Sequence, residues 1–298
     1  MRPPFPLVSI ISINYNSLQD TLEFLESVHR LSYPAIEIIL VDNASRENPK
    51  EIIQMKFPQV KFIRSGRNLG FGGGNNLGIV ASKGQYLLFL NNDTLVVAGF
   101  IETLVEFMVD HPDAGMASPK VLFPDGKTIQ YAGAIKISAL TGRGKRLGLM
   151  ESDNGEYDRT YKTDLGHGAA MIVPRDVMNR VGLLPEVYFL YYEEHDWCEQ
   201  IKRHGYSMYY VGTTKILHKE SVSTGGDESY LKVYFINRNR LLFMRRNSSG
   251  LPLMLGISFF FLISIPKKMS SYLLKGKFNL VKALWNGIYW NLTNFKTG

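Results

Sequence analysis

The sequence of 298 residues predicts an α/β fold, in which helices cover a mostly parallel central sheet. Segments typical of strands and of helices alternate up to residue 95 in a β-α-β-α-β-α-β order, the pattern of such sheets. The strand segments are continuous apolar runs, as expected where both faces of a sheet are buried. Several of these runs end in Asn or Asp, which predicts a polar edge.

The first elements follow from local patterns. Residues 7–16, LVSIISINYN, and residues 35–45, AIEIILVDNAS, are the first two expected strands. The helix between them begins at Asp20, a suitable N-cap, and repeats apolar residues on one face. A short helix is expected at residues 49–57, and the chain then enters a third strand.

The third strand spans residues 60–65, and the fourth spans residues 84–93 and ends in Asn-Asn-Asp. The glycine-rich residues 66–82 between them predict a flexible loop that leads into a helix. Right-handed crossovers bring the carboxyl ends of parallel strands to one rim, where open α/β sheets bind their ligands. The polar residues expected on this rim are Asn14, Tyr15, Asn16, Asp42, Asn43, Asn91, Asn92 and Asp93.

The alternation becomes less regular beyond residue 100. A Pro-Asp-Gly turn in residues 114–133 predicts two joined strands, and residues 139–164 contain polar stretches that we expect to be mobile. Residues 191–206 predict an amphipathic helix with acids in its first turn, which the helix dipole favours. The further expected elements are a helix at 100–112, a strand and helix at 166–182, and a strand at 207–221 that ends near His218.

The glycine-rich stretch NLGFGGGNN suggests a phosphate site. Backbone N–H groups just before a helix can cradle a phosphate. The stretch is not a Walker P-loop, because no Gly-Lys-Ser/Thr follows, and it lacks the third glycine of the dinucleotide fingerprint. A plain flexible turn is the alternative.

Three side chains near strand ends have chemistry that suits a nucleotide. Asp42 can accept hydrogen bonds from a base or a ribose, or it can cap a turn. Asp93 can bind a divalent cation that neutralises a diphosphate, or it can also be a cap. His218 is a candidate second metal ligand, and a purely structural histidine is the alternative.

The net charge of +7 is unevenly distributed. Residues 231–298 contain eleven Lys or Arg and no Asp or Glu, whereas the other 230 residues contain 23 bases and 27 acids. The single cysteine, Cys198, excludes an intramolecular disulfide, and the N-terminus lacks the apolar region of a signal peptide. We therefore expect a cytoplasmic protein whose basic charge belongs to its C-terminal region.

The C-terminal region suggests a membrane surface. Its apolar run of about fifteen residues is followed by lysines, and it is shorter than the roughly 20 residues that span a bilayer. Such a segment suits the membrane interface, with lysines attracted to anionic lipid. A helix packed on the core is the alternative. No recognised nucleic-acid motif is present, so we expect no nucleic-acid partner.

Taken together, the segments VSIISINYNS, EIILVDNAS, RNLGFGGGNN, YLLFLNNDT, YYEEHDWC and ILHKES resemble the inverting glycosyltransferases of family 2. Within that family they are similar to the rhamnosyltransferase-like branch that builds bacterial surface polysaccharides. The resemblance covers roughly residues 7–246. It implies a GT-A, Rossmann-like domain at residues 1–230, with a nucleotide-binding half (1–95) and an acceptor-binding half (96–230). Residues 231–298 would be a helical, membrane-associating extension.

The resemblance implies roles for the residues that would bind the nucleotide. Tyr15 and Asn16 would line the nucleotide pocket, and Asp42 would contact the base. The ribose and diphosphate would be surrounded by Arg67, Asn68, Gly70 and Asn75.

The resemblance also implies a metal site. Asn91, Asn92 and Asp93 stand where the family has its Asp-X-Asp motif, so Asp93 would hold Mg²⁺ or Mn²⁺ with His218 as the other protein ligand. The sequence departs from the pattern at Asn91, where the family has an acid. An amide still offers a carbonyl oxygen, but the lost charge should weaken metal binding.

Glu194 matches the acidic position that the family uses as catalytic base, with Glu193 and Asp196 beside it as acids that would position the acceptor or a loop. The alternative is that all three acids serve the helix start or ion pairs. The implied reaction is a single displacement. A carboxylate deprotonates an acceptor hydroxyl, which attacks the anomeric carbon of a nucleotide-sugar with inversion.

The expected partners follow from this chemistry. The donor would be a dTDP-sugar such as dTDP-rhamnose, or a UDP-hexose. The acceptor would be a saccharide or a lipid-linked sugar at the inner face of the cell membrane, where the protein would be peripherally bound. A nucleotide-sugar-binding protein without turnover is the main alternative, because Asn91 leaves it open. A membrane-bound structural protein would explain only the C-terminal region.

Overall fold

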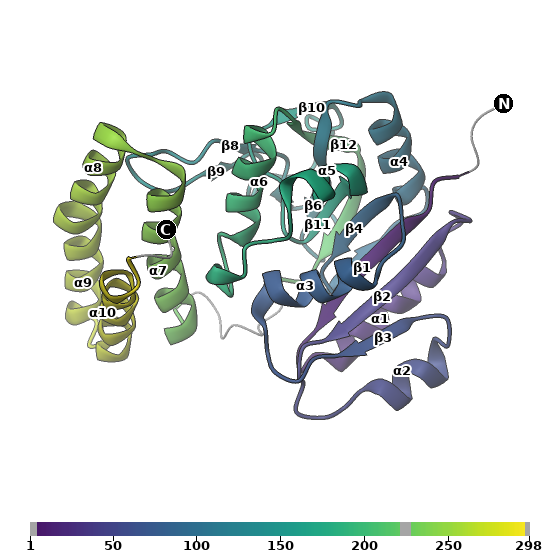
Figure 1. The fold of residues 1–298 in the computed structure, drawn as a ribbon, viewed down its shortest axis with the longest axis horizontal. Helices are drawn as coiled ribbons and strands as arrows, with labels where there is room; N and C mark the ends of the chain where they lie inside the picture. Colours follow the sequence, from purple (N-terminus) through teal and green to yellow (C-terminus); the bar gives the residue numbers. More distant parts are fainter. Residues whose placement is uncertain (1–4, 221–227, 296–298) are drawn as a thin grey trace.

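A mixed sheet of ten strands forms the centre of the protein, in the order β10-β12-β6-β11-β4-β1-β2-β3, with β5 paired to β12 and β7 paired to β6. The computed structural model describes residues 5–220 and 228–295. Helices flank the sheet, and a group of C-terminal helices lies at one end of the molecule (Figure 1). The predicted α/β class with a helical C-terminal extension is confirmed.

The strands of the main sheet are β1 (Val8–Asn14), β2 (Ile36–Asp42), β3 (Lys61–Arg64), β4 (Tyr86–Leu90), β5 (Thr94–Val96), β6 (Ala114–Leu122), β7 (Ile129–Tyr131), β10 (Thr160–Thr163), β11 (Ala170–Pro174) and β12 (Ser207–His218). The helices that precede the C-terminal group are α1 (Leu18–His29), α2 (Lys50–Lys56), α3 (Gly70–Ala81), α4 (Phe100–Asp110), α5 (Arg175–Val181), the 3-10 turn η1 (Glu186–Tyr188) and α6 (Glu193–Arg203).

The first four strands are parallel, as predicted. β1 pairs with β2 and β4, and β2 pairs with β3. The core residues of β1 and β2 are almost fully buried, because helices cover both faces of these strands. The register pairs Asn14 with Asp42, so two of the predicted rim residues lie directly opposite each other.

The second half of the sheet is mixed. β11 runs antiparallel to both β4 and β6, and β12 runs parallel to β6. β6 and β7 are antiparallel, as the Pro-Asp-Gly turn predicts, and Asp125 accepts hydrogen bonds from the backbone N–H groups of Lys127 and Thr128. The rim at the carboxyl end of β4 is therefore bordered by segments from the second half of the chain.

The polar stretches between residues 139 and 164, which we expected to be mobile, include short strands. This part of the chain forms β10 and a small sheet of β8 (Ala134–Ile135) with β9 (Lys145–Arg146). A buried cation explains the order. Lys120 lies 2.6 Å from Asp153 Oδ1 and also pairs with Asp158. Because a charge removed from water needs opposite charge around it, this cluster holds the polar chain against β6.

The glycine-rich stretch is also different from the prediction. It is not a flexible loop before a helix, because helix α3 begins at Gly70 and contains the glycines. A Cβ at Gly78 would lie 2.4 Å from Ile11 Cγ2, and one at Gly74 would lie 2.8 Å from Ile13 Cδ1. The glycines therefore allow α3 to pack closely on β1.

The C-terminal group consists of α7 (Tyr230–Asn247), α8 (Gly250–Phe259), a π-helical turn (Phe260–Ser264), α9 (Ile265–Leu274) and α10 (Phe278–Thr293). Leu242 and Phe243 of α7 belong to the main core, and α7 to α10 share a second small core around Leu284. Helix α7 thus joins the extension to the sheet domain (Figure 1).

Residues Gly250–Leu274 form one helical stretch of 25 residues that is long and apolar enough to cross a membrane, by length and composition only. The helix is longer than the apolar run suggests, because it continues through Lys267 and Lys268. Only 22% of its apolar window is buried in the protein, so packing on the core does not account for its composition. Exposed apolar side chains on this stretch include Leu255, Leu262 and Leu274.

Candidate active site

The carboxyl ends of β1 and β2 form a buried hydrogen-bonded cluster around Asp42. Asn14 Nδ2 lies 2.8 Å from Asp42 Oδ1, and Arg64 Nη1 lies 3.1 Å from Asp42 Oδ2. The backbone N–H of Ser45 also donates to Oδ2, over 3.2 Å. Asp42 is fully buried. Both carboxylate oxygens therefore have protein partners, and Asp42 fixes the two loops that follow β1 and β2.

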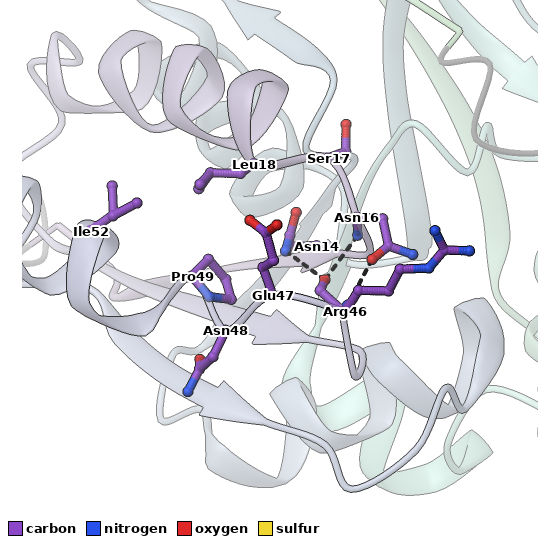
Figure 2. A pocket seen from close by; sticks show the side chains of 10 residues that line it. Asn14, Asn16, Ser17, Leu18, Arg46, Glu47, Asn48, Pro49 and Ile52 are labelled. Atoms are coloured by element: carbon purple, nitrogen blue, oxygen red, sulfur yellow. Dashed lines mark hydrogen bonds between the residues drawn. The ribbon is translucent and has the colours of Figure 1, made fainter.

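A pocket of about 460 Å³ opens beside this cluster, between the loops after β1 and β2 (Figure 2). The Asn16 side chain accepts a hydrogen bond from the backbone N–H of Arg46, and Ser45 Oγ accepts one from the backbone N–H of Asn16. Asn16 has a left-handed φ of 54°. The residues that line the pocket are Asn14, Asn16, Ser17, Leu18, Ser45, Arg46, Glu47, Asn48, Pro49 and Ile52.

Of the predicted nucleotide residues, Asn16 lines this pocket, and Tyr15 beside it is partly exposed. Arg46 and Glu47 also line it, and the sequence analysis did not identify them. The polar run Arg46-Glu47-Asn48 after the second strand could have indicated that these residues line a site. The pocket has donors, acceptors and an apolar wall from Leu18, a combination suited to a polar ligand with a flat ring.

The remaining predicted nucleotide residues lie at the start of α3. Asn43 Nδ2 lies 3.0 Å from both Asn68 Oδ1 and the carbonyl oxygen of Gly70, so Asn43 ties β2 to this helix. Arg67 is exposed on the same turn. Asn75 is buried in α3, and its amide donates to the Phe71 carbonyl. The amide of Asn75 is thus used within helix α3 itself.

Asp93 and His218 meet where β4 ends and β12 ends. His218 Nε2 lies 3.2 Å from Asp93 Oδ1 and 3.3 Å from the amide nitrogen of Asn91. His218 Nδ1 lies 2.6 Å from Gln130 Oε1, and the Gln130 amide nitrogen faces Glu220. The two predicted metal ligands are therefore adjacent and buried.

This arrangement fits a cation. Gln130 Oε1 occupies Nδ1 of His218, so the other ring nitrogen, Nε2, is the one presented to the Asp93 carboxylate, and both groups could bind a cation placed between them. A histidine held through its second nitrogen by an oxygen is the usual support of a metal ligand. Among residues 5–220 and 228–295, no group of three His, Cys, Asp or Glu side chains is placed to hold a metal. A bound cation would take further ligands from the substrate or water.

Asn92 lies beside this pair but points elsewhere. Its amide donates to Thr21 Oγ1 over 2.8 Å, and Thr21 in turn donates to Asn14 Oδ1 over 2.9 Å. Asn92 therefore links the end of β4 to α1 and to the cluster around Asp42. The structure gives it a positioning contact.

The three predicted catalytic acids begin helix α6, and the structure separates their surroundings. Glu193 is almost fully buried, and burial together with the nearby charge of Glu194 raises the pKa of its carboxyl well above the usual range. Asp196 is buried against α7, where Arg246 Nε lies 3.1 Å from Oδ2 and Asn247 Nδ2 lies 2.6 Å from Oδ1. Asp196 is thus engaged in joining two helices.

Glu194 is the acid of this group that is partly exposed, with 19% of its side chain accessible. A Cβ at Gly168 would lie 3.7 Å from Glu194 Oε1, so the carboxyl lies against this glycine. The next residue, Ala169, accepts a hydrogen bond from the backbone N–H of Asn91 over 3.0 Å. Gly168, which contacts Glu194, and Ala169, which binds Asn91, therefore connect Glu194 to the end of β4.

His167, which the sequence analysis did not identify, precedes this segment. Its ring lies 5.0 Å from the Tyr131 ring and 6.1 Å from the His218 ring, between centroids. Burial, with a smaller contribution from the charge of His218, lowers the pKa of His167 well below the usual value. In the sequence, the position of His167 between two glycines, Gly166 and Gly168, could have indicated a residue of the site.

Comparison with known proteins identifies the family. The model of the family described as Glycosyl transferase family 2 matches residues 9–181. An N-acetylglucosaminyl-diphospho-decaprenol L-rhamnosyltransferase of Mycobacterium tuberculosis is 24% identical over 268 residues, which cover 82% of this chain and 86% of the relative. A low-salt glycan biosynthesis hexosyltransferase of Haloferax volcanii, Agl10, is 26% identical over 241 residues, covering 79% of this chain and 74% of the relative.

Solved structures share the fold. The mannosyltransferase PcManGT from Pyrobaculum calidifontis, in complex with GDP-Man and Mn²⁺, has a TM-score of 0.60 at 15% identity and covers 98% of this chain and 84% of its own. S. aureus TarS 1-349 has a TM-score of 0.59 at 15% identity, covering 95% and 80%. These likenesses confirm the GT-A fold. The family match extends over more than half of the residues, and the chain therefore belongs to glycosyl transferase family 2.

Proposed function

We propose that the protein transfers a sugar from a nucleotide-sugar, dTDP-rhamnose or a UDP-hexose, to a hydroxyl of a saccharide or lipid-linked acceptor, with inversion. The observation that carries the proposal is the position of Glu194. It lies against Gly168, and the next residue, Ala169, accepts a hydrogen bond from the backbone N–H of Asn91, so one short segment contacts both Glu194 and the end of β4. A base and a diphosphate-binding group on opposite sides of a reacting carbon are what an inverting displacement needs.

Glu194 is the proposed base because it is the accessible acid of the three. Its neighbour Glu193 is almost fully buried, and this burial, together with the charge of Glu194, raises the pKa of the Glu193 carboxyl well above the usual range. Two adjacent carboxyls with different surroundings can in this way divide their roles. The Asp196 carboxylate, paired with Arg246, would support the helix that presents Glu194.

The nucleoside is proposed to bind in the pocket of Figure 2, with Asn16 and Tyr15 beside it. Asp42 would act on the base mainly by holding Asn14 and the Ser45 loop, because its oxygens already have protein partners. Arg67, at the start of α3, would meet the diphosphate. Two relatives, one named as a rhamnosyltransferase and the other as a hexosyltransferase, support both donor classes.

Asp93 and His218 are proposed to hold Mg²⁺ or Mn²⁺, which would neutralise charge on the leaving diphosphate. The buried Asp93–His218 pair, with Nδ1 of His218 occupied by Gln130, supports this assignment. A solved mannosyltransferase of the same fold contains Mn²⁺. Because Asn91 brings no charge, the affinity for the cation should be low.

We propose that the C-terminal helices attach the protein peripherally to the cytoplasmic face of the cell membrane. Their support is an exposed apolar surface, which includes Leu262, Leu274, Phe278 and Trp285, in a region with eleven bases and no acids. A relative named for a decaprenol-linked acceptor is consistent with work at a membrane.

The test is release of nucleoside diphosphate by the purified full chain from a panel of dTDP- and UDP-sugars, with and without Mn²⁺ and with membrane extract as acceptor source. We expect release from one donor, increased by Mn²⁺ and lost in Asp93→Asn. The control is Asp110→Asn at the end of α4, which lies outside the site. If no donor is turned over while nucleotide still raises the melting temperature, the protein is a non-catalytic nucleotide-sugar binder, the alternative that Asn91 leaves open.

A further inference from the structure

The chain that leads into α6 is held by one residue of the C-terminal extension. Asn239 of α7 is fully buried. Its amide nitrogen lies 3.0 Å from the carbonyl oxygen of Tyr188, 2.7 Å from that of Leu190 and 2.8 Å from that of Tyr191. The nitrogen of a single carboxamide thus lies within hydrogen-bond distance of three backbone carbonyls in residues 187–192, which we call the acid-presenting segment.

Arg238, the preceding residue, holds the other end of the same segment. Its Nη2 lies 2.7 Å from the carbonyl oxygen of Val187 and 2.5 Å from that of Tyr188. Its guanidinium carbon lies 4.5 Å from the centre of the Trp290 ring of α10. A guanidinium between an aromatic face and carbonyl oxygens is fixed in direction, because its planar fork makes several bonds at once.

The acid-presenting segment needs such support. Phe189, Tyr191 and Tyr192 have φ values of 64°, 68° and 77°, in the left-handed region that non-glycine residues rarely adopt. Strained backbone of this kind persists only where surrounding contacts determine it, and it gathers at functional sites. Tyr192 is the N-cap of α6, so the direction of the segment decides where the next residues, Glu193 and Glu194, begin the helix.

We propose that Arg238 and Asn239 are positioning residues for the transfer reaction, which fix the left-handed segment so that Glu194 lies at the rim beside Gly168. The inference rests on the proposed function, because Glu194, the residue that is positioned, is the proposed base of that reaction. It gives the extension a second role. Through Trp290 and Arg238, the helices assigned to the membrane also contact the backbone that leads to the catalytic acids.

The test compares Asn239→Asp with Asn237→Asp in the full chain. The first variant turns a donor toward three carbonyl oxygens into a carboxylate that repels them. The second is a matched control. Asn237 is equally buried in α7, but its amide donates to Val233 within its own helix, over 2.6 Å. Arg238→Lys, which keeps the charge and loses the fork, is the milder third variant.

Two readouts are taken. Hydrogen exchange of residues 187–194 should be accelerated at least about tenfold in Asn239→Asp and remain at the wild-type rate in Asn237→Asp. The kcat for transfer should fall by about 10- to 100-fold in Asn239→Asp, with the donor KM within about twofold and the pH profile of kcat displaced, because a misplaced base reacts poorly while the nucleotide pocket is intact. Arg238→Lys should show the same changes at smaller size.

The outcomes are distinct. Unchanged exchange in Asn239→Asp, or faster exchange with unchanged kcat and pH profile, would overturn the proposal, as would an equal effect of Asn237→Asp. If the wild-type protein turns over no donor, the proposed function fails on its own. The exchange comparison then still decides whether Asn239 and Arg238 hold the segment.

Discussion

Replacement of Gly70 by Ala tests the packing of α3, which joins the pocket side of the rim to the acid-presenting segment. Gly70 has a φ of 70°, and a Cβ there would lie 2.0 Å from the carbonyl oxygen of Phe189. That oxygen also accepts a 2.8 Å hydrogen bond from the backbone N–H of Phe71. The change therefore introduces backbone strain, a steric overlap and the loss of one hydrogen bond.

These contributions can be added as orders of magnitude. The left-handed conformation costs about 1 kcal/mol for a non-glycine residue, the overlap costs about 1–3 kcal/mol, and the hydrogen bond contributes about 1 kcal/mol. We expect Gly70→Ala to lower the free energy of unfolding by about 3–5 kcal/mol on this basis.

Two controls separate the contributions. Gly99 has a φ of 73°, close to that of Gly70, with no heavy atom within 4 Å of a Cβ, so Gly99→Ala should show strain alone, about 1 kcal/mol. Gly66 has open space and no positive φ, so Gly66→Ala should change stability by less than about 0.5 kcal/mol. Urea unfolding followed by circular dichroism measures all three. If Gly70→Ala is no less stable than Gly99→Ala, the close contact with Phe189 is refuted, and the stretch is the flexible loop that the sequence suggested.

Three further predictions concern other parts of the molecule. Glu193 has a raised pKa in the folded protein, so the unfolded chain binds fewer protons between its ordinary pKa and the raised one, and stability should fall as pH rises through that window. Glu193→Gln should remove this fall, which is measured as the urea midpoint of unfolding between about pH 5 and 8. At the upper end of this range the variant should be more stable than the wild-type protein. An unchanged pH dependence would contradict the raised pKa of Glu193. Lys120→Ala removes the nearer cation from the carboxylate of Asp153 and leaves only Lys215, 3.9 Å from Oδ2. It should destabilise by about 3–5 kcal/mol, with the change read from urea unfolding against the exposed control Lys127→Ala. Arg46→Ala should weaken the binding of nucleoside diphosphate in calorimetry and leave the melting temperature unchanged, and equal affinity would place the nucleotide elsewhere.

The parallel half of the fold follows from the sequence because its signals are local. Continuous apolar strands, short connections and polar strand ends predict the sheet and its rim, and the register that pairs Asn14 with Asp42 agrees with that expectation. Asp93 and His218 are 125 residues apart in the sequence, and only the family resemblance suggested that they form one site. In the structure His218 Nε2 lies 3.2 Å from Asp93 Oδ1. Roles at the rim remain predictions.

What the sequence did not reveal depends on contacts between distant segments. The glycines of α3 have low helix propensity, so local preference predicts a loop, but close packing on β1 and on Phe189 favours the helix. The polar chain after residue 139 is ordered by a buried lysine far away in sequence. Asp196 resembles a catalytic acid by its place in the motif, and its bonds to Arg246 and Asn247 become visible only when α6 meets α7.

The most direct test of the central claim is the kcat of Glu194→Gln, measured at saturating donor and acceptor beside Glu199→Gln. Both acids lie on α6, but Glu199 pairs with Lys202 away from the rim. We expect Glu194→Gln to lower kcat by about 10²- to 10⁴-fold with little change in donor KM, while Glu199→Gln remains near wild type. Equal activity of the two variants would show that Glu194 is not the base and would contradict the proposed site.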